Sequence, residues 1–99
     1  MPQPPPPQEN AVPVPWYRED QWDLLRRHAP DADEFETTYE EYAAGMRTGE
    51  ENLRRAGLNP YRVWIDVAQM LRWCREKGYD LDGDSRASYI GLKCNGFVP

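Results

Sequence analysis

The strongest constraint on this chain is a row of apolar side chains spaced for one face of a long helix. The row starts at Phe35, ends at Ala56 and alternates steps of four and three residues, which keeps side chains on one side of an α-helix. Its members are Phe35, Tyr39, Tyr42, Met46, Gly49, Leu53 and Ala56. Asp33 followed by Glu36 has the form of a capping box, and Gly57 suits a left-handed cap. We therefore expect one helix of about 23 residues whose aromatic row is the buried seam of the fold.

Two further helices are predicted on either side of this long one. Acidic side chains precede basic ones from Glu19 to His28, an order that suits the helix dipole, and Pro30 ends the segment. Asp66 is placed to cap a third helix that Gly78 ends. The expected buried face of that third helix consists of Val67, Met70, Leu71 and Cys74.

A fourth helix is predicted near the end of the chain. Either Asp82 or Asp84 is placed to cap it, and the pair at residues 95–96 closes it. The side chains expected to face inward are Ala87, Ile90 and Cys94. Tyr89 then lies on the opposite side of this helix.

A short strand is predicted at residues 61–65, because apolar and polar side chains alternate there. A single strand is not stable, so this segment needs a partner. Residues 12–16 are the best candidate. Pro13 and Pro15 lack N–H groups on the same side, so that segment pairs along one side only and forms an edge strand. The alternative partner is the same strand from a second copy, which makes a dimer.

These segments predict a mainly α fold with four helices and one short strand, or an α+β fold if the strand is paired. The chain has 99 residues, which allows one domain at most. Seven of its ten prolines lie in the first fifteen residues. We assign residues 1–11 to a disordered proline-rich tail and residues 12–99 to a single small helical domain. The tail is interpreted as solubilising, and its alternative role is as a ligand for a proline-binding domain through Pro4 and Pro7.

The net charge of −5 is carried by the domain, since Glu9 is the one acidic residue of the tail. An acidic domain is repelled by phosphate backbones and anionic lipids, so binding to nucleic acid or to a membrane surface is disfavoured. No apolar run approaches the roughly 20 residues of a membrane span, and the start of the chain lacks the pattern of a secretory signal. We therefore expect a soluble cytoplasmic protein.

The charges are divided between two stretches. Residues 31–51 hold eight acidic residues and one basic residue, whereas residues 52–78 hold six basic and two acidic residues. We expect the two stretches to lie side by side and neutralise each other. The alternative is an exposed acidic helix face that mimics a phosphate backbone and inhibits a nucleic-acid-binding protein. That face would consist of Glu34, Glu36, Glu40, Glu41, Glu50 and Glu51.

The common catalytic and metal-binding patterns are missing from the sequence, so we expect no catalytic residue, metal or cofactor. The chain has one histidine, His28, and no Cys-x-x-Cys pair for zinc. Cys74 and Cys94 are interpreted as small buried side chains rather than as a disulfide or a reactive thiol. Residues 80–84 resemble the opening of a calcium loop, but Ser85 replaces the required glycine and Gly91 the required acid.

Several aromatic side chains do not belong to any of the predicted apolar faces. Unless other helices cover them, they are exposed rings beside arginines, a composition typical of interface hot spots. The candidate partner-binding residues are Trp64, Trp73, Tyr89, Arg62, Arg72 and Arg86.

A set of short motifs resembles a family of short bacterial hypothetical proteins of unknown function. The motifs are Trp16-Tyr17, Thr38-Tyr39-Glu40-Glu41, Val63-Trp64-Ile65-Asp66, Trp73-Cys74, and Leu81-Asp82-Gly83 followed by Arg86-Ala87. The resemblance covers residues 16–92 and not the proline-rich tail. It implies a bacterial, cytosolic, stand-alone domain and supplies no activity.

The sequence thus favours a non-enzymatic protein-interaction module, which either self-associates through residues 61–65 or binds an unknown protein partner. Two alternatives remain open. One is a small-ligand binder or enzyme with an unrecognised site, and the other is the acidic inhibitor described above.

Overall fold

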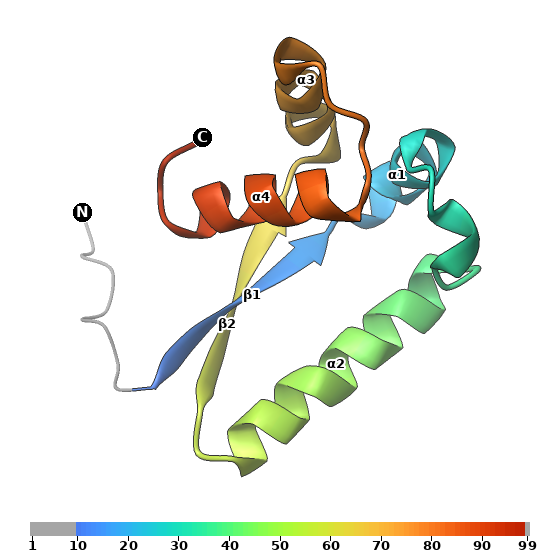
Figure 1. The fold of residues 1–99 in the computed structure, drawn as a ribbon. Helices are drawn as coiled ribbons and strands as arrows, with labels where there is room; N and C mark the ends of the chain where they lie inside the picture. Colours follow the sequence, from blue (N-terminus) through green and yellow to red (C-terminus); the bar gives the residue numbers. More distant parts are fainter. Residues whose placement is uncertain (1–9, 99) are drawn as a thin grey trace.

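A computed structural model describes residues 10–98 of the chain (Figure 1). Over these residues the fold is mainly α with a small two-stranded sheet, as predicted. The strands are β1 (Ala11–Tyr17) and β2 (Asn59–Ile65), and the helices are α1 (Trp22–His28), α2 (Tyr39–Arg55), α3 (Val67–Lys77) and α4 (Gly83–Cys94). Short 3₁₀ turns, Glu19–Gln21 and Ala32–Glu34, precede and follow α1.

The two strands pair in parallel, with Ala11 opposite Asn59 and Trp16 opposite Trp64. This pairing confirms that residues 12–16 provide the partner for the strand predicted at 61–65. Most of the tail predicted at 1–11 lies outside the described residues. Its last residue, Ala11, is the first residue of β1.

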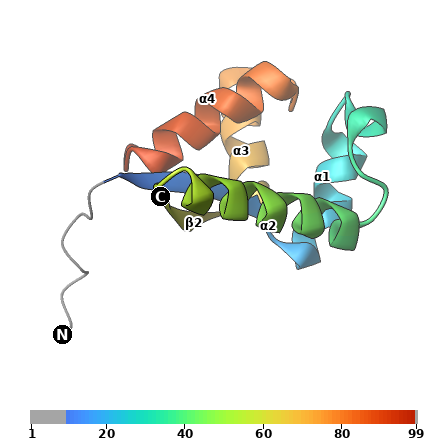
Figure 2. The same cartoon turned by 90° about the horizontal axis from the view of Figure 1, so that it is seen from below.

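Helices cover both faces of the sheet, as a parallel pair of strands requires. On one face, Val14 and Trp16 of β1 pack against Ala43 of α2. On the other, Ile65 joins a larger core formed with α1, α3 and α4. Accordingly, α4 crosses one side of the strands and α2 runs along another (Figures 1 and 2). No helix within residues 10–98 has the length and apolar character needed to cross a membrane.

The long helix starts later than the sequence pattern predicts. Thr38 caps α2 by accepting the Glu41 N–H at 3.1 Å, whereas Asp33 lies in the separate 3₁₀ turn. The Thr38 hydroxyl also donates to the Glu41 carboxylate at 3.1 Å, so the two side chains hold each other at the start of the helix. Phe35 therefore precedes the helix, yet it still packs in the core, with its ring 6.1 Å from that of Trp22.

The buried face of α2 follows the predicted seam in part, because Tyr39, Tyr42, Met46 and Leu53 pack, partly buried, against the core residues. Gly49 and Ala56 are exposed, and the side chains that are buried are Ala43 and Glu50. The end of the helix follows the prediction, because Gly57 has a φ of 86° and the Leu58 amide donates to the Leu53 carbonyl at 3.0 Å.

In α3 the predicted cap is confirmed, whereas the inward face predicted for α4 is confirmed at Ile90, which packs partly buried against the core, and is wrong at Ala87. Asp66 caps α3 as expected, and α4 is capped by Asp82. The side chains of α4 that are buried are Arg86 and Tyr89, whereas Ala87 is exposed. The large Tyr89 ring packs against Trp73, and Arg86 reaches an acidic partner. These contacts outweigh the burial of the small Ala87 side chain.

Candidate interaction surface

The structure divides the candidate partner-binding residues among separate places. Arg62 and Trp64 lie on β2, on the side that faces α2. The remaining residues belong to α3 and α4: Arg72, Trp73, Tyr89 and Arg86. They do not form one continuous surface.

Arg62 takes part in a network that joins the sheet to α2. The buried carboxylate of Glu50 accepts the Trp16 Nε1–H at 3.1 Å and two N–H groups of Arg62, at 3.0 and 2.9 Å. The Arg62 guanidinium also lies over the Trp16 ring, 3.9 Å from its centroid. These hydrogen bonds, led by those from Arg62, hold the pKa of Glu50 below its usual value. The network satisfies a buried charge that would otherwise destabilise the fold.

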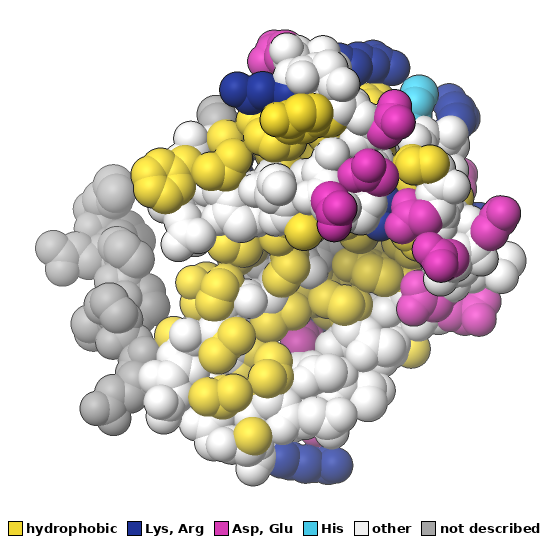
Figure 3. Space-filling view, in the orientation of Figure 1, with side chains coloured by type: hydrophobic (Ala, Val, Ile, Leu, Met, Phe, Trp, Pro, Cys, Tyr) yellow, Lys and Arg dark blue, Asp and Glu magenta, His cyan; other side chains and the backbone are white. Residues whose placement is uncertain are grey.

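This network corrects the predicted acidic helix face. Glu50 was expected to be exposed there, but it is 3% exposed. Ion pairs of Glu50 with Arg62 and of Glu51 with Arg55 join the acidic stretch to the basic one. On the face drawn in Figure 3, the acidic side chains gather beside the starts of α2 and α4. The acidic face is therefore shorter and more fully neutralised than the inhibitor hypothesis assumes.

Arg86 belongs to the interior of the molecule. Its guanidinium donates to both carboxylate oxygens of Asp31, at 2.7 and 2.8 Å, and to the Leu81 carbonyl at 2.8 Å. It also lies 5.0 Å from the ring centroid of Phe35. The same hydrogen bonds lower the pKa of Asp31. Arg86 thus fastens the start of α4 to the segment after α1, which leaves little of it for a partner.

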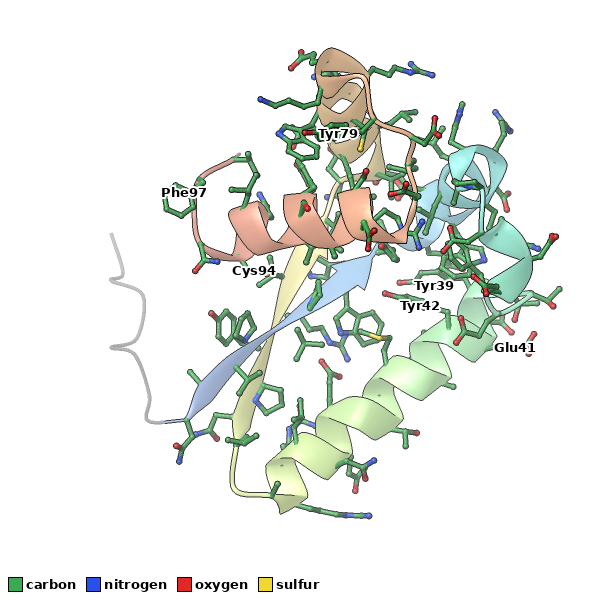
Figure 4. The ribbon with its side chains drawn as sticks, in the orientation of Figure 1. Tyr39, Glu41, Tyr42, Tyr79, Cys94 and Phe97 are labelled. Carbon is green, nitrogen blue, oxygen red and sulfur yellow. The ribbon has the colours of Figure 1, made fainter. Side chains whose placement is uncertain are left out.

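Three of the candidate residues do meet, in a groove of about 220 Å³ between α3 and the end of the chain. The groove is lined by Gln69, Arg72, Trp73, Glu76, Tyr89 and Val98. Tyr89 is only 2% exposed, so it forms the floor of the groove and is not accessible to a partner. Tyr79 and Phe97 project into solvent nearby (Figure 4). Half of the lining side chains are polar or charged, and the other half are aromatic or aliphatic.

A second cavity, of about 100 Å³, lies among aromatic side chains where β1, α1 and α2 meet. Its rings contact one another, with Trp22 and Tyr42 4.8 Å apart and Tyr17 and Tyr42 5.9 Å apart. It has room for a few water molecules at most. Over residues 10–98, no three side chains of the kinds that bind metals are grouped closely enough to hold an ion.

The outer edge of β1 is closed to a further strand. Pro13 and Pro15 have no N–H to offer there. Beyond them, Tyr17 donates its N–H to the Tyr42 hydroxyl at 2.9 Å and accepts the Tyr39 hydroxyl at 2.8 Å. Both tyrosines project from the first turn of α2 (Figure 4). A neighbouring strand would find few free groups along this edge.

Over residues 10–98, the outer edge of β2 is open. Backbone groups of a strand point alternately to its two sides. The Asn59 amide donates to Asn10 at 2.9 Å, so odd-numbered residues of β2 face β1 and even-numbered ones face away. The amides of Arg62 and Trp64 therefore lie along the outer edge, where no strand within residues 10–98 pairs with β2. We call this the β2 edge, and it comprises Pro60, Arg62 and Trp64.

Two aromatic side chains flank the β2 edge, one on each face of the sheet. Trp64 is 45% exposed on the α2 side, and Tyr61 is 48% exposed on the opposite side. Sequence reasoning named Trp64 as a candidate binding residue and included Tyr61 only as part of the 61–65 segment expected to self-associate. The available signal for Tyr61 was its position near the start of the strand.

Comparisons of the chain with protein-family models, curated proteins and solved structures gave no match. The functional assignment therefore depends on the geometry of the molecule itself.

Proposed function

We propose that this protein is a non-enzymatic protein-interaction module that binds its partner by accepting a strand at the β2 edge. The observation that carries the proposal is the contrast between the two sides of the sheet. The β1 edge is closed by two prolines and two tyrosine hydroxyls, whereas the β2 edge presents the amides of Arg62 and Trp64.

Strand addition is a common way for small domains to bind extended segments of other proteins. Backbone hydrogen bonds supply affinity, and side chains that alternate along the edge supply specificity. Here the side chains beside the edge are Tyr61, Arg62 and Trp64, which are residue types enriched in binding hot spots. An exposed edge with two large aromatic side chains is otherwise an aggregation hazard, which favours its use as a binding site.

The charged side chains in the interior support a structural role for the network rather than a catalytic one. Glu50 is bound to Arg62 and Trp16, and Asp31 is bound to Arg86. Cys74 is fully buried, and burial raises the pKa of its thiol, which disfavours the nucleophilic thiolate.

The test compares the wild-type chain with Trp64→Pro and Trp64→Ala. Both variants lose the indole, but only Trp64→Pro also removes an amide from the β2 edge. Because that amide faces away from β1, the substitution leaves the hydrogen bonds between β1 and β2 in place. Circular dichroism and thermal unfolding establish that each variant is folded.

Quantitative affinity capture with the tagged full chain then measures recovered partners. We expect Trp64→Pro to reduce recovery well below that of Trp64→Ala. Arg75→Ala, at an exposed position of α3 that does not line the groove, serves as the surface control and is expected to leave recovery unchanged. Equal recovery by wild type and a folded Trp64→Pro variant would contradict strand addition at this edge.

A further inference from the structure

We infer that the strand accepted by the β2 edge is β2 of a second copy of this chain, antiparallel to the first. This inference rests on the proposed function and names the partner. The two copies are related by a twofold axis perpendicular to the sheet, and their strands form one continuous sheet in the order β1–β2–β2–β1. The evidence is the self-complementarity of β2.

The backbone groups of two β2 edges match when Arg62 of each copy lies opposite Trp64 of the partner subunit. In this register the Arg62 amide donates to the partner's Trp64 carbonyl, and the Trp64 amide donates to the partner's Arg62 carbonyl. Each copy therefore donates twice and accepts twice. Pro60, which has no N–H, lies outside the paired region.

The side chains favour the same register. On the α2 side, each Trp64 indole lies beside the aliphatic part of the partner's Arg62 side chain, whose guanidinium is held over its own Trp16, 3.9 Å from the ring centroid, and on its own Glu50. On the opposite side, Val63 meets its own copy on the twofold axis. A register shifted by two residues places Arg62 opposite the partner's Arg62, and like charges directly opposite are unfavourable.

The closed β1 edge limits the assembly to two copies. Within the described part of the chain, the sheet has one open edge and one closed edge, so pairing at β2 leaves a four-stranded sheet whose outer strands both carry Pro13 and Pro15. A heterologous contact would propagate into fibres, but this isologous contact closes on itself. Four strands is also a common sheet size, whereas two are marginal.

Sedimentation equilibrium tests the stoichiometry. We expect the wild-type chain to show twice the 11.6 kDa mass of one copy. Trp64→Pro should raise the dissociation constant of the dimer by more than about tenfold, because both copies lose an edge hydrogen bond. A wild-type chain that remains monomeric at millimolar concentration, or a folded Trp64→Pro variant that dimerises as tightly as wild type, overturns the inference.

Disulfide trapping tests the register. In a Cys94→Ser background, Val63→Cys places two thiols opposite each other on the twofold axis, at the short separation of a non-hydrogen-bonded pair. Oxidation should yield covalent dimer. Tyr61→Cys is the matched control, because in this register each Tyr61 faces Ile65 of the partner subunit. Crosslinking of Tyr61→Cys in preference to Val63→Cys overturns the register.

The two proposals fail differently. A monomeric wild-type chain that still captures a partner through the β2 edge removes the second-copy inference and leaves strand addition standing. Loss of both the dimer and the edge-dependent capture removes both.

Discussion

The Glu50 carboxylate on α2 accepts the indole N–H of Trp16 on β1 at 3.1 Å, across 34 residues of sequence. Glu50 is buried, and it also accepts two N–H groups of Arg62 on β2. One acidic side chain therefore links a helix to both strands of the sheet. Its removal should loosen the contact between the two layers.

We predict that Glu50→Gln lowers the free energy of unfolding by about 1–2 kcal/mol, because charge-assisted hydrogen bonds to Arg62 are lost while Arg62 keeps partial access to water. Urea denaturation at neutral pH measures the change. Glu51→Gln is the matched control, since the neighbouring Glu51 is exposed and pairs only with Arg55. Its effect should stay within about 0.5 kcal/mol. Equal effects of the two substitutions would show that the network contributes nothing special.

Because of the Glu50 carboxylate, we expect the free energy of unfolding to depend on pH in the acidic range. The pKa of Glu50 is lowered in the folded protein from its ordinary value of 4.5. The unfolded chain therefore takes up this proton at higher pH than the folded chain does. The contribution of Glu50 is fully present above pH 4.5 and is lost as the pH falls through the lower folded pKa. The stability difference between wild type and Glu50→Gln should accordingly shrink in urea titrations at progressively lower pH.

Tyr42 predicts an alkaline transition. Burial raises its pKa from 10.0 to about 12, so the folded chain holds this proton more tightly than the unfolded chain. The resulting stability is fully present below pH 10 and is lost as the pH rises through about 12. Tyr42→Phe should weaken this dependence. At neutral pH it should cost about 1 kcal/mol, because the Tyr17 amide loses its acceptor. Chemical denaturation of both proteins at pH 7 and from pH 8 to 12 measures the loss at neutral pH and the alkaline dependence. If the variant shows the same alkaline dependence as the wild type, Tyr42 is not its source.

The start of α2 can be checked with two substitutions. Thr38→Ala should destabilise the protein by about 1 kcal/mol, because it removes the hydroxyl that accepts the Glu41 amide. Asp33→Ala should change the free energy of unfolding by less than about 0.5 kcal/mol, because Asp33 is exposed and caps no helix. The reverse order would restore the earlier helix start that the apolar row predicts.

Much of the fold follows from local signals in the sequence. The paired prolines at 13 and 15 identified β1 as an edge strand, and the alternation at 61–65 identified β2. Asp66 and Gly78 mark the ends of α3 because caps and left-handed turns depend on few residues. Such features are set by chemistry close in sequence.

The features that failed depend on contacts distant in sequence. Glu50 is buried because Trp16 and Arg62 supply its hydrogen bonds, and no helical periodicity contains that information. Arg86 faces inward because Asp31 lies 55 residues earlier in the chain. Of the candidate interaction residues, Trp64 is exposed, as predicted for an aromatic side chain outside the apolar faces. Tyr89 instead belongs to the core, where its ring packs against Trp73.

The parallel pairing of β1 with β2 also has a consequence for synthesis. A strand near the start of the chain finds its only bonded neighbour within residues 10–98 after α1 and α2 have been made. While the ribosome adds those residues, β1 has no strand to pair with. Because Pro13 and Pro15 lack N–H groups, β1 then offers few donors for incorrect pairing. The edge chemistry that shapes the finished sheet therefore also protects the nascent chain during the interval before β2 emerges.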